Sequence, residues 1–416
     1  MESTVWVGRV RGIVQVEHPL RLPAWVGAAT RVVIALLLIF LFSGPASCRA
    51  NGQSNGLANG LAAAADASRI VTDAFGRKVR LPPEIHRLVA LGSSMAFVTY
   101  LGEQAKAVGV EDIEKTALTK PYAMLNRELF AGLPVVGMGG AVRIPDYERI
   151  LSLRPDVVFL LSVDRSEPDL LQRKLRIPVV AVSQGFPDFD EEAFLSSILL
   201  TGEVLNKREK ARNLVQQVRA LADELWYRPE PENQVVAYVG GLSYKGQQGI
   251  TSSAGKFFPF QLARIANVVD AIGQTGHCFV DREFVLSVNP PVLFVDGNGL
   301  PLIREDEKTH GGYYARLRAV RAGKVWLLLP HTSYFNNPEV LYCNAFFMAK
   351  AAYPDHYAAM DPVAKADAIF TLFNGAPLYA RYVEETGGFA RLILAKDAEE
   401  AGTMERQDEY APVPAQ

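Results

Sequence analysis

A long polar loop in the middle of the chain, Gly240–Phe260, reads "GGLSYKGQQGITSSAGKFFPF" and directly follows the apolar run "VVAYV". Glycine, serine and lysine in such a loop suit three kinds of site: a phosphate cradle, a nucleophile elbow, or a lip around a bulky ligand. The phosphate cradle is disfavoured, because the GxxxxGK[ST] order is missing and Lys256 is followed by Phe257 rather than by serine or threonine.

The nucleophile elbow is only approximately matched. The stretch "GLSYKG" differs from GxSxG because its second glycine comes one position late, and the tight spacing is what exposes the serine hydroxyl. Asp296 and His331 occur later in the chain, but at spacings that any chain offers. A secreted α/β hydrolase that uses Ser243 therefore stays open as an alternative from a different class.

The binding lip fits the composition of this loop best. Glycine lets the backbone approach a ligand closely, while serine hydroxyls, lysine ammonium groups and aromatic faces supply the contacts. The candidate ligand-binding residues in this stretch are Tyr244, Lys245, Ser252, Ser253, Lys256 and Phe257. For Phe258 and Phe260 a core position is the better interpretation, at the start of a helix "FPFQLARIANVVDAIG".

Short apolar runs without polar alternation must position this loop and others like it. Such runs are typical of strands covered on both faces. They are Arg87–Gly92, Pro155–Ser162, Ile177–Ser183, Val235–Gly240, Pro291–Gly297 and Lys324–Pro330. Helical stretches such as Asp146–Leu153 and Glu167–Leu175 lie between them, so the alternation predicts an α/β fold with mostly parallel sheets.

One segment interrupts this alternation. Residues 188–227 contain one glycine, no proline, and apolar residues at helical spacing, for example Leu214, Val218, Leu221 and Leu225. We predict a single long helix here, or two helices joined near Gly202–Asn206. Because it separates two α/β sets, we interpret it as a rigid connection between two lobes.

The loops that follow the strands supply further candidate binding residues, since parallel sheets bind ligands at the carboxyl ends of their strands. In the N-terminal half the candidates are Ser93, Ser94, Met138, Gly139, Gln184 and Phe186. In the C-terminal half they are Asn298, His331 and Tyr334. The remaining histidines are scattered without an HxxxH or HxH pair, so we predict no dedicated site for a bare metal ion.

Composition excludes several classes of protein. Lys plus Arg (43) nearly balance Asp plus Glu (45), and no basic stripe with interleaved aromatics is present, so we predict no nucleic-acid binding. Three cysteines without a CxxC pair exclude a disulfide scaffold. Cys278 and Cys343 are expected either to pair after export or to stay as buried free thiols.

The N-terminal region resembles an export signal. Eleven apolar residues, Val32–Phe42, follow Arg31 and are too few to span a bilayer comfortably. "SGPASC" then ends at Cys48, which resembles a lipobox whose cysteine is lipidated, although Pro45 departs from the usual residue. The alternative is a single N-terminal membrane anchor, and either one leaves the folded part tethered outside the membrane.

Three stretches together resemble substrate-binding proteins of ABC importers for iron chelates (siderophores) and vitamin B12. They are "VTDAFGRKVRLPPEIHRLVAL", "VVGMGGAVRIPDYERILSLRPDVVFL" and "GKVWLLLPHTSYFNNPEVLYCNAFFMAKAAYPDHY". The resemblance implies two Rossmann-like α/β lobes joined by a single long helix, with a ligand cleft between the lobes. It also implies no catalysis, no cofactor, and a monomer that delivers its ligand to an ABC permease and the ATPase of that permease.

The predicted organisation follows from the pattern and the resemblance together. We expect an export signal at 1–48, a flexible tether at 49–69, an N-terminal lobe at 70–187, a linking helical segment at 188–228, a C-terminal lobe at 229–396 and a polar tail at 397–416. The resemblance implies an iron(III) chelate as the ligand, with a cobamide or haem as the alternative. His331 and Tyr334 are then candidates for direct contact with the iron, and Lys245 and Lys256 for contact with chelator charge.

Overall fold

The chain is described here from a computed structural model that covers residues 68–394, apart from 141 and 187, together with residues 410–411. These residues belong to one compact unit, Ala62–Gln416. The predicted export signal with Cys48, and all of the predicted tether except its last two residues, lie outside the described residues. Within the predicted polar tail, Tyr410–Ala411 forms a short strand, β18.

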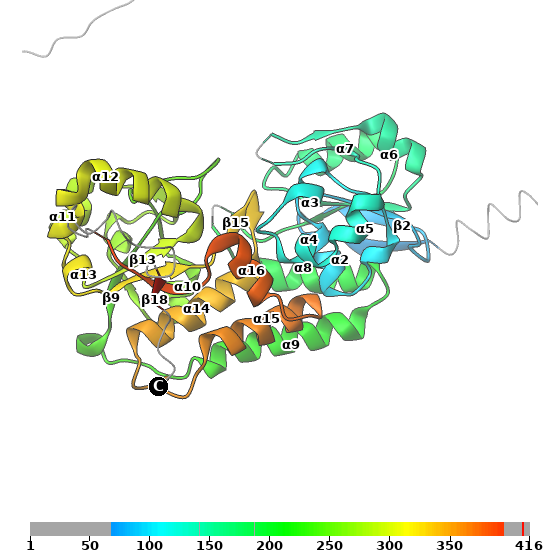
Figure 1. Cartoon of the computed structure of the whole chain (residues 1–416). Helices are drawn as coiled ribbons and strands as arrows, with labels where there is room; N and C mark the ends of the chain where they lie inside the picture. The colour runs from blue at the N-terminus through cyan, green and yellow to red at the C-terminus, as the bar shows by residue number, and fades with distance from the viewer. Residues whose placement is uncertain (1–67, 141, 187, 395–409, 412–416) are drawn as a thin grey trace, which may run out of the picture. The chain divides into compact units, whose positions relative to one another are not determined.

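Two separate parallel sheets dominate the fold (Figure 1). The N-terminal sheet has the order β4-β3-β7-β8, with all neighbours parallel. Its strands are β3 (Leu88–Leu91), β4 (Ala107–Gly109), β7 (Val157–Leu161) and β8 (Val179–Val182). Every residue of β3, β7 and β8 is buried, which is why these strands read as unbroken apolar runs in the sequence.

The C-terminal sheet has the order β11-β9-β13-β14-β17-β18, and only its last two strands are antiparallel to their neighbours. Its other strands are β9 (Val236–Gly240), β11 (Ala266–Asn267), β13 (Val292–Asp296), β14 (Val325–Leu328) and β17 (Ala390–Leu392). All six predicted strands are therefore present. The predicted α/β fold with mostly parallel sheets is confirmed.

Helices and two-stranded ribbons surround the sheets. The helices of the N-terminal half are α2 (Met95–Tyr100), α3 (Asp112–Thr116), α4 (Pro121–Leu125), α5 (Arg127–Gly132), α6 (Tyr147–Leu153) and α7 (Glu167–Leu175). Those of the C-terminal half are α10 (Phe258–Leu262), α11 (Arg282–Val288), α12 (Leu300–Arg316), α13 (Arg318–Arg321), α14 (Pro338–Ala352), α15 (Pro362–Asn374) and α16 (Tyr379–Thr386). The ribbons pair β1 (Arg69–Thr72) with β2 (Lys78–Leu81), β5 (Gly137–Met138) with β6 (Ile144–Pro145), β10 (Ser252–Gly255) with β12 (Gly276–Phe279), and β15 (Thr332–Ser333) with β16 (Phe335–Asn336).

The linking segment forms the second of the two predicted arrangements, a pair of helices rather than one continuous rod. Helix α8 (Glu191–Val204) ends where Asn206 takes a left-handed conformation (φ 57°), and α9 (Arg208–Glu224) runs back against α8. A side chain at Gly202 would meet the Ala211 Cβ at 2.4 Å, so glycine is what allows the two helices to approach here.

A continuous hydrophobic core joins the N-terminal and C-terminal sheets. It contains Phe97 and Phe159 from the N-terminal half, Val218 from α9, and Phe294 from the C-terminal sheet. Helix α15 belongs to the C-terminal half of the chain, yet it packs on α2 and α4 of the N-terminal half. Helices α9, α14 and α15 lie together in Figure 1. The two halves are thus held by shared packing in addition to the chain connection.

Buried polar contacts reinforce this junction. The Tyr100 hydroxyl of α2 donates to Glu339 Oε2 of α14 over 2.7 Å, and Asn374 Nδ2 donates to the other carboxylate oxygen over 3.2 Å. Asn337 Nδ2 donates to the Thr119 carbonyl over 2.7 Å. Because Glu339 is fully buried, it ties three helices together where water cannot replace its partners.

Candidate ligand-binding site

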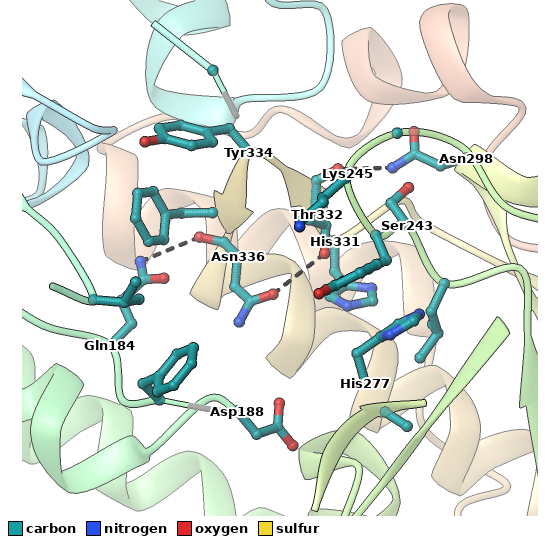
Figure 2. A pocket seen from close by; sticks show the side chains of 18 of the residues that line it. Gln184, Asp188, Ser243, Lys245, His277, Asn298, His331, Thr332, Tyr334 and Asn336 are labelled. Atoms are coloured by element: carbon teal, nitrogen blue, oxygen red, sulfur yellow. Dashed lines mark hydrogen bonds between the residues drawn. The ribbon is translucent and has the colours of Figure 1, made fainter. Parts of the chain in front are cut away.

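A pocket of about 800 Å³ lies between the loops that follow the strands of both sheets (Figure 2). On the N-terminal side, the end of β7 with the loop after it contributes Leu161–Val163, and the loop after β8 contributes Gln184–Phe186. The loops after β9, β13 and β14 contribute residues 242–247, Asn298 and residues 334–336. The pocket therefore opens at the carboxyl ends of parallel strands, as the sequence predicted.

His331 is a fixed group in the wall of this pocket. Its Nδ1 lies 2.8 Å from Asp296 Oδ2, and both residues are buried. A carboxylate only accepts, so Nδ1 carries a proton and Nε2 is the nitrogen left for a ligand. Asp296 Oδ1 accepts the backbone N–H of Asn298 over 2.9 Å, which holds the carboxylate in place.

The lip formed by residues 242–249 rests on a second histidine. The ring of Tyr244 stacks on His277 with centroids 4.2 Å apart and planes 8° from parallel, and Lys245 Nζ lies 5.4 Å from the Tyr244 ring centre. The Ser252 hydroxyl donates to the Leu242 carbonyl, so it accepts from His277 Nε2 over 2.8 Å. Burial lowers the pKa of His277, which favours the neutral ring in this stack.

The opposite wall comes from the loop after β8. Gln184 Nε2 donates to the Asn336 carbonyl over 3.2 Å, so the amide is oriented with Oε1 turned away from that carbonyl. Phe186 is 72% exposed at the rim. Asp188 also lines the pocket, and burial raises the pKa of its carboxyl group.

Tyr334 stands at the turn of the short β15–β16 hairpin. Its φ of 81° is a left-handed conformation that is strained for an aromatic residue. Burial raises the pKa of its hydroxyl, and the charges of Arg143 and Glu111 act on it from the N-terminal half. The hairpin thus reaches from the C-terminal sheet toward the N-terminal wall, as Figure 2 shows for Tyr334.

Eight of the fifteen predicted binding residues line this pocket. They are Gln184, Phe186, Tyr244, Lys245, Phe257, Asn298, His331 and Tyr334. Sequence reasoning did not select Asp188, His277, Thr332 or Asn336, which also line it. Asp188 and Asn336 each lie within a few residues of a selected position, but His277 comes from β12, which reaches the pocket only through its pairing with β10.

The other seven predicted residues do not line the pocket. They are Ser93, Ser94, Met138, Gly139, Ser252, Ser253 and Lys256. The Ser93 hydroxyl accepts from the buried Lys120 over 2.7 Å, and Ser252 and Ser253 are fully buried in β10 instead of lying in an open loop. Lys256 lines a second cavity, beside Arg264.

The described lining of the pocket offers no complete set of protein ligands for a bare metal. Within the described residues, no group of three or more His, Cys, Asp or Glu side chains is placed to hold a metal ion. Cys278 and Cys343 are both buried free thiols, so the alternative in which they pair is wrong. In the same part of the chain, no hydrogen bond joins Ser243 to a histidine, as an activated nucleophile would require.

The chain belongs to the periplasmic binding protein family, whose model matches residues 88–331. It is 28% identical over 319 residues to the molybdate-binding protein MolA of Haemophilus influenzae, covering 71% of this chain and 88% of MolA. The structure of MolA bound to molybdate matches with a TM-score of 0.60 and 25% identity, over 74% of this chain and 98% of MolA.

A second solved structure supports the fold alone. An ABC transporter solute binding protein from Sulfurospirillum deleyianum matches with a TM-score of 0.58 and 21% identity, over 76% of this chain and 98% of that one. The predicted resemblance to binding proteins of ABC importers is confirmed. Proteins of this kind bind small ligands, work with a permease and its ATPase, and are transport proteins rather than enzymes.

The family also supports a periplasmic location. Across residues 68–394, with the two gaps noted above, the structure contains no helix with the length and apolar character needed to cross a membrane. The predicted tethering through Cys48, or through an N-terminal anchor, concerns residues that the structure does not describe.

Proposed function

We propose that this protein captures an iron(III) chelate outside the cytoplasmic membrane and delivers it to an ABC permease. The size and lining of the pocket carry this proposal. A volume of about 800 Å³ lies within the range of roughly 300–1,000 Å³ that encloses an organic molecule of drug-like size.

The chemistry of the lining supports an organic ligand. Aromatic faces from Phe186, Tyr244, Phe257, Tyr334 and Phe335 surround the pocket, and apolar surface of this kind binds carbon skeletons rather than hydrated ions. A metal held here needs a chelator of its own, because the described residues supply no three-ligand cluster. His331 Nε2 and the Tyr334 hydroxyl are the groups that fit a direct contact to such a metal.

Molybdate is the second candidate, because MolA of Haemophilus influenzae, which shares 28% identity with this chain, is named for that ligand. Cobamide and haem remain alternatives of similar size to a siderophore complex. Calorimetric titration of the purified protein with ferric hydroxamate and catecholate chelates, haem, cobalamin and molybdate separates these ligands. Calorimetry is preferable to tryptophan fluorescence, since the described tryptophans, Trp226 and Trp326, do not line the pocket.

The proposal predicts saturable binding of at least one ferric chelate, with no heat from free chelator at the same concentration. Native mass spectrometry of the protein purified from its own host provides an independent measurement, because a tightly held ligand adds its mass to the chain. Binding of molybdate alone, or of haem or cobalamin alone, rejects the iron-chelate proposal. Ser243→Ala tests the hydrolase alternative, because a hydrolase should lose all turnover in this variant, whereas a receptor should keep its ligand with little or no change in affinity.

A further inference from the structure

Asp188 stands out among the pocket residues because none of the described side chains forms an ion pair with its carboxylate. Oδ1 accepts the backbone N–H of Phe189 over 2.8 Å. Among the residues that the structure describes, no lysine, arginine or histidine forms an ion pair with this carboxylate. It is also the one Asp or Glu in the described lining of the pocket.

The surroundings of Asp188 favour a positively charged ligand as the partner that its carboxylate lacks among the described residues. Burial raises the pKa of its carboxyl group, which means that water solvates the ionised form poorly. His331 is the titratable side chain whose charge acts on it, but the Nδ1 proton of His331 is directed to Asp296. The carboxylate is half-buried, and the Phe189 N–H is its one donor among the described residues, so acceptor positions are left for a ligand in the pocket.

A second acceptor on the same loop is also unfilled. Gln184 Oε1 is buried and has no hydrogen-bond partner among the described residues, while Nε2 of the same amide is engaged by Asn336. Exchanging the two amide atoms would place oxygen against the Asn336 carbonyl, so the orientation follows from that contact. The wall formed by Gln184 and Asp188 therefore presents to the pocket hydrogen-bond acceptors that no described protein donor fills.

Positive charge is placed elsewhere in the pocket. Lys245 is the one lysine or arginine in the described lining, and it lies on the lip above the Tyr244 ring. Figure 2 shows Lys245 in the upper part of the view and Asp188 at the bottom. A tetrahedral dianion such as molybdate has acceptors only, so it would meet repulsion at the Gln184 and Asp188 wall.

We propose that the ligand of this pocket carries a protonated amine, or an equivalent cationic N–H donor, that binds against Asp188. This inference rests on the proposed function and makes it more specific: the ligand is a metal chelate with a cationic arm. A charge-assisted hydrogen bond to a partly buried carboxylate is stronger than a neutral one. We therefore expect at least a tenfold preference for a chelate with the ammonium over one without it.

The test uses a matched pair of probes. One is the iron(III) complex of a linear trihydroxamate that ends in a primary ammonium, and the other is the same complex acetylated at that amine. Dissociation constants are measured by calorimetry for the wild-type protein, Asp188→Asn and Asp164→Asn. Asp164 is exposed and lies outside the pocket lining, so its variant controls for the loss of one surface carboxylate.

We expect the wild-type protein and Asp164→Asn to prefer the ammonium form tenfold or more, and Asp188→Asn to bind the two forms within twofold of each other. Asp188→Ser is a second variant if the asparagine form does not fold, as judged by its thermal unfolding. Equal binding of both probes by the wild-type protein, or an unchanged preference in both Asp188 variants, overturns this inference but leaves the proposed function in place. Binding of molybdate without either ferric complex overturns both.

Discussion

Glu111 lies buried in the N-terminal half, beside the pocket wall, and offers a direct test of the electrostatics of this region. It is 1% exposed, and its Oε2 accepts the Gly92 N–H over 2.8 Å. Its Oε1 has no partner among the described residues. Burial, reinforced by the neighbouring Glu114 carboxylate, raises the pKa of Glu111 from 4.5 to about 7, although Arg143 and Lys120 oppose the rise.

This raised pKa makes the free energy of unfolding depend on pH. The carboxyl group is harder to ionise in the folded protein than in the unfolded chain. The stabilisation of the folded state that results is therefore fully present below about pH 4.5. It is lost as the pH rises through 7. At about 1.4 kcal/mol for each pKa unit, the folded protein loses about 3 kcal/mol between pH 4.5 and pH 8.5 through this residue.

Substitution of Glu111 by glutamine removes the titration and keeps an oxygen that accepts the Gly92 N–H. Urea unfolding followed by circular dichroism, at intervals from pH 4.5 to 8.5, measures the free energy of unfolding of each protein. We expect Glu111→Gln to gain about 3 kcal/mol relative to the wild-type protein across that range. Glu148→Gln, at an exposed position, is the control for removal of a carboxylate. Parallel pH curves for the wild-type protein and Glu111→Gln would refute this reasoning.

Three further substitutions test the helix pair, the junction and the lip. Gly202→Ala places a methyl group within 2.4 Å of the Ala211 Cβ, so we expect urea unfolding to show a loss of about 1–3 kcal/mol in the free energy of unfolding. An unchanged urea midpoint would mean that α8 and α9 separate easily to admit the methyl group. Glu339→Ala leaves the Tyr100 hydroxyl without its buried acceptor and should lower the free energy of unfolding by about 3 kcal/mol. Glu339→Gln keeps an acceptor oxygen and should recover much of that stability. Equal stability of the two variants contradicts the role of Glu339 as a buried acceptor. Lys245→Met should weaken binding of an anionic chelate several-fold in calorimetry while thermal stability stays the same; equal affinity would place the ligand away from the lip.

Much of the fold was predictable because buried parallel strands leave a strong sequence pattern. Strands β3, β7 and β8 are buried on both faces, so their apolar runs were visible without any structural information. The stretch 258–273 was predicted as one helix, but only Phe258–Leu262 is α-helical. Arg264 takes a left-handed conformation (φ 58°), and Ala266–Asn267 pairs with the edge of the C-terminal sheet. Edge pairing of this kind depends on a partner that is distant in the sequence.

The binding residues were predictable to the extent that they directly follow a predicted strand. His331 and Asn298 come soon after β14 and β13, so the rule that ligands bind at the carboxyl ends of parallel strands was enough to select them. Ser252 and Ser253 were selected as loop hydroxyls, but they form a strand because β12 supplies a partner for β10. His277 enters the site through that same pairing, which no local sequence pattern indicates.

The hydrophobic core that runs through both halves affects how binding strength is determined. A receptor whose halves move as separate bodies spends part of its interaction energy on ordering them around the ligand. Here that order is already set by side chains such as Phe97, Phe294 and Val218, which pack in one core before any ligand arrives. Affinity is then decided by the loops at the strand ends, and a new preference can evolve by exchange of side chains such as Phe186 or Lys245 while the supporting framework stays the same.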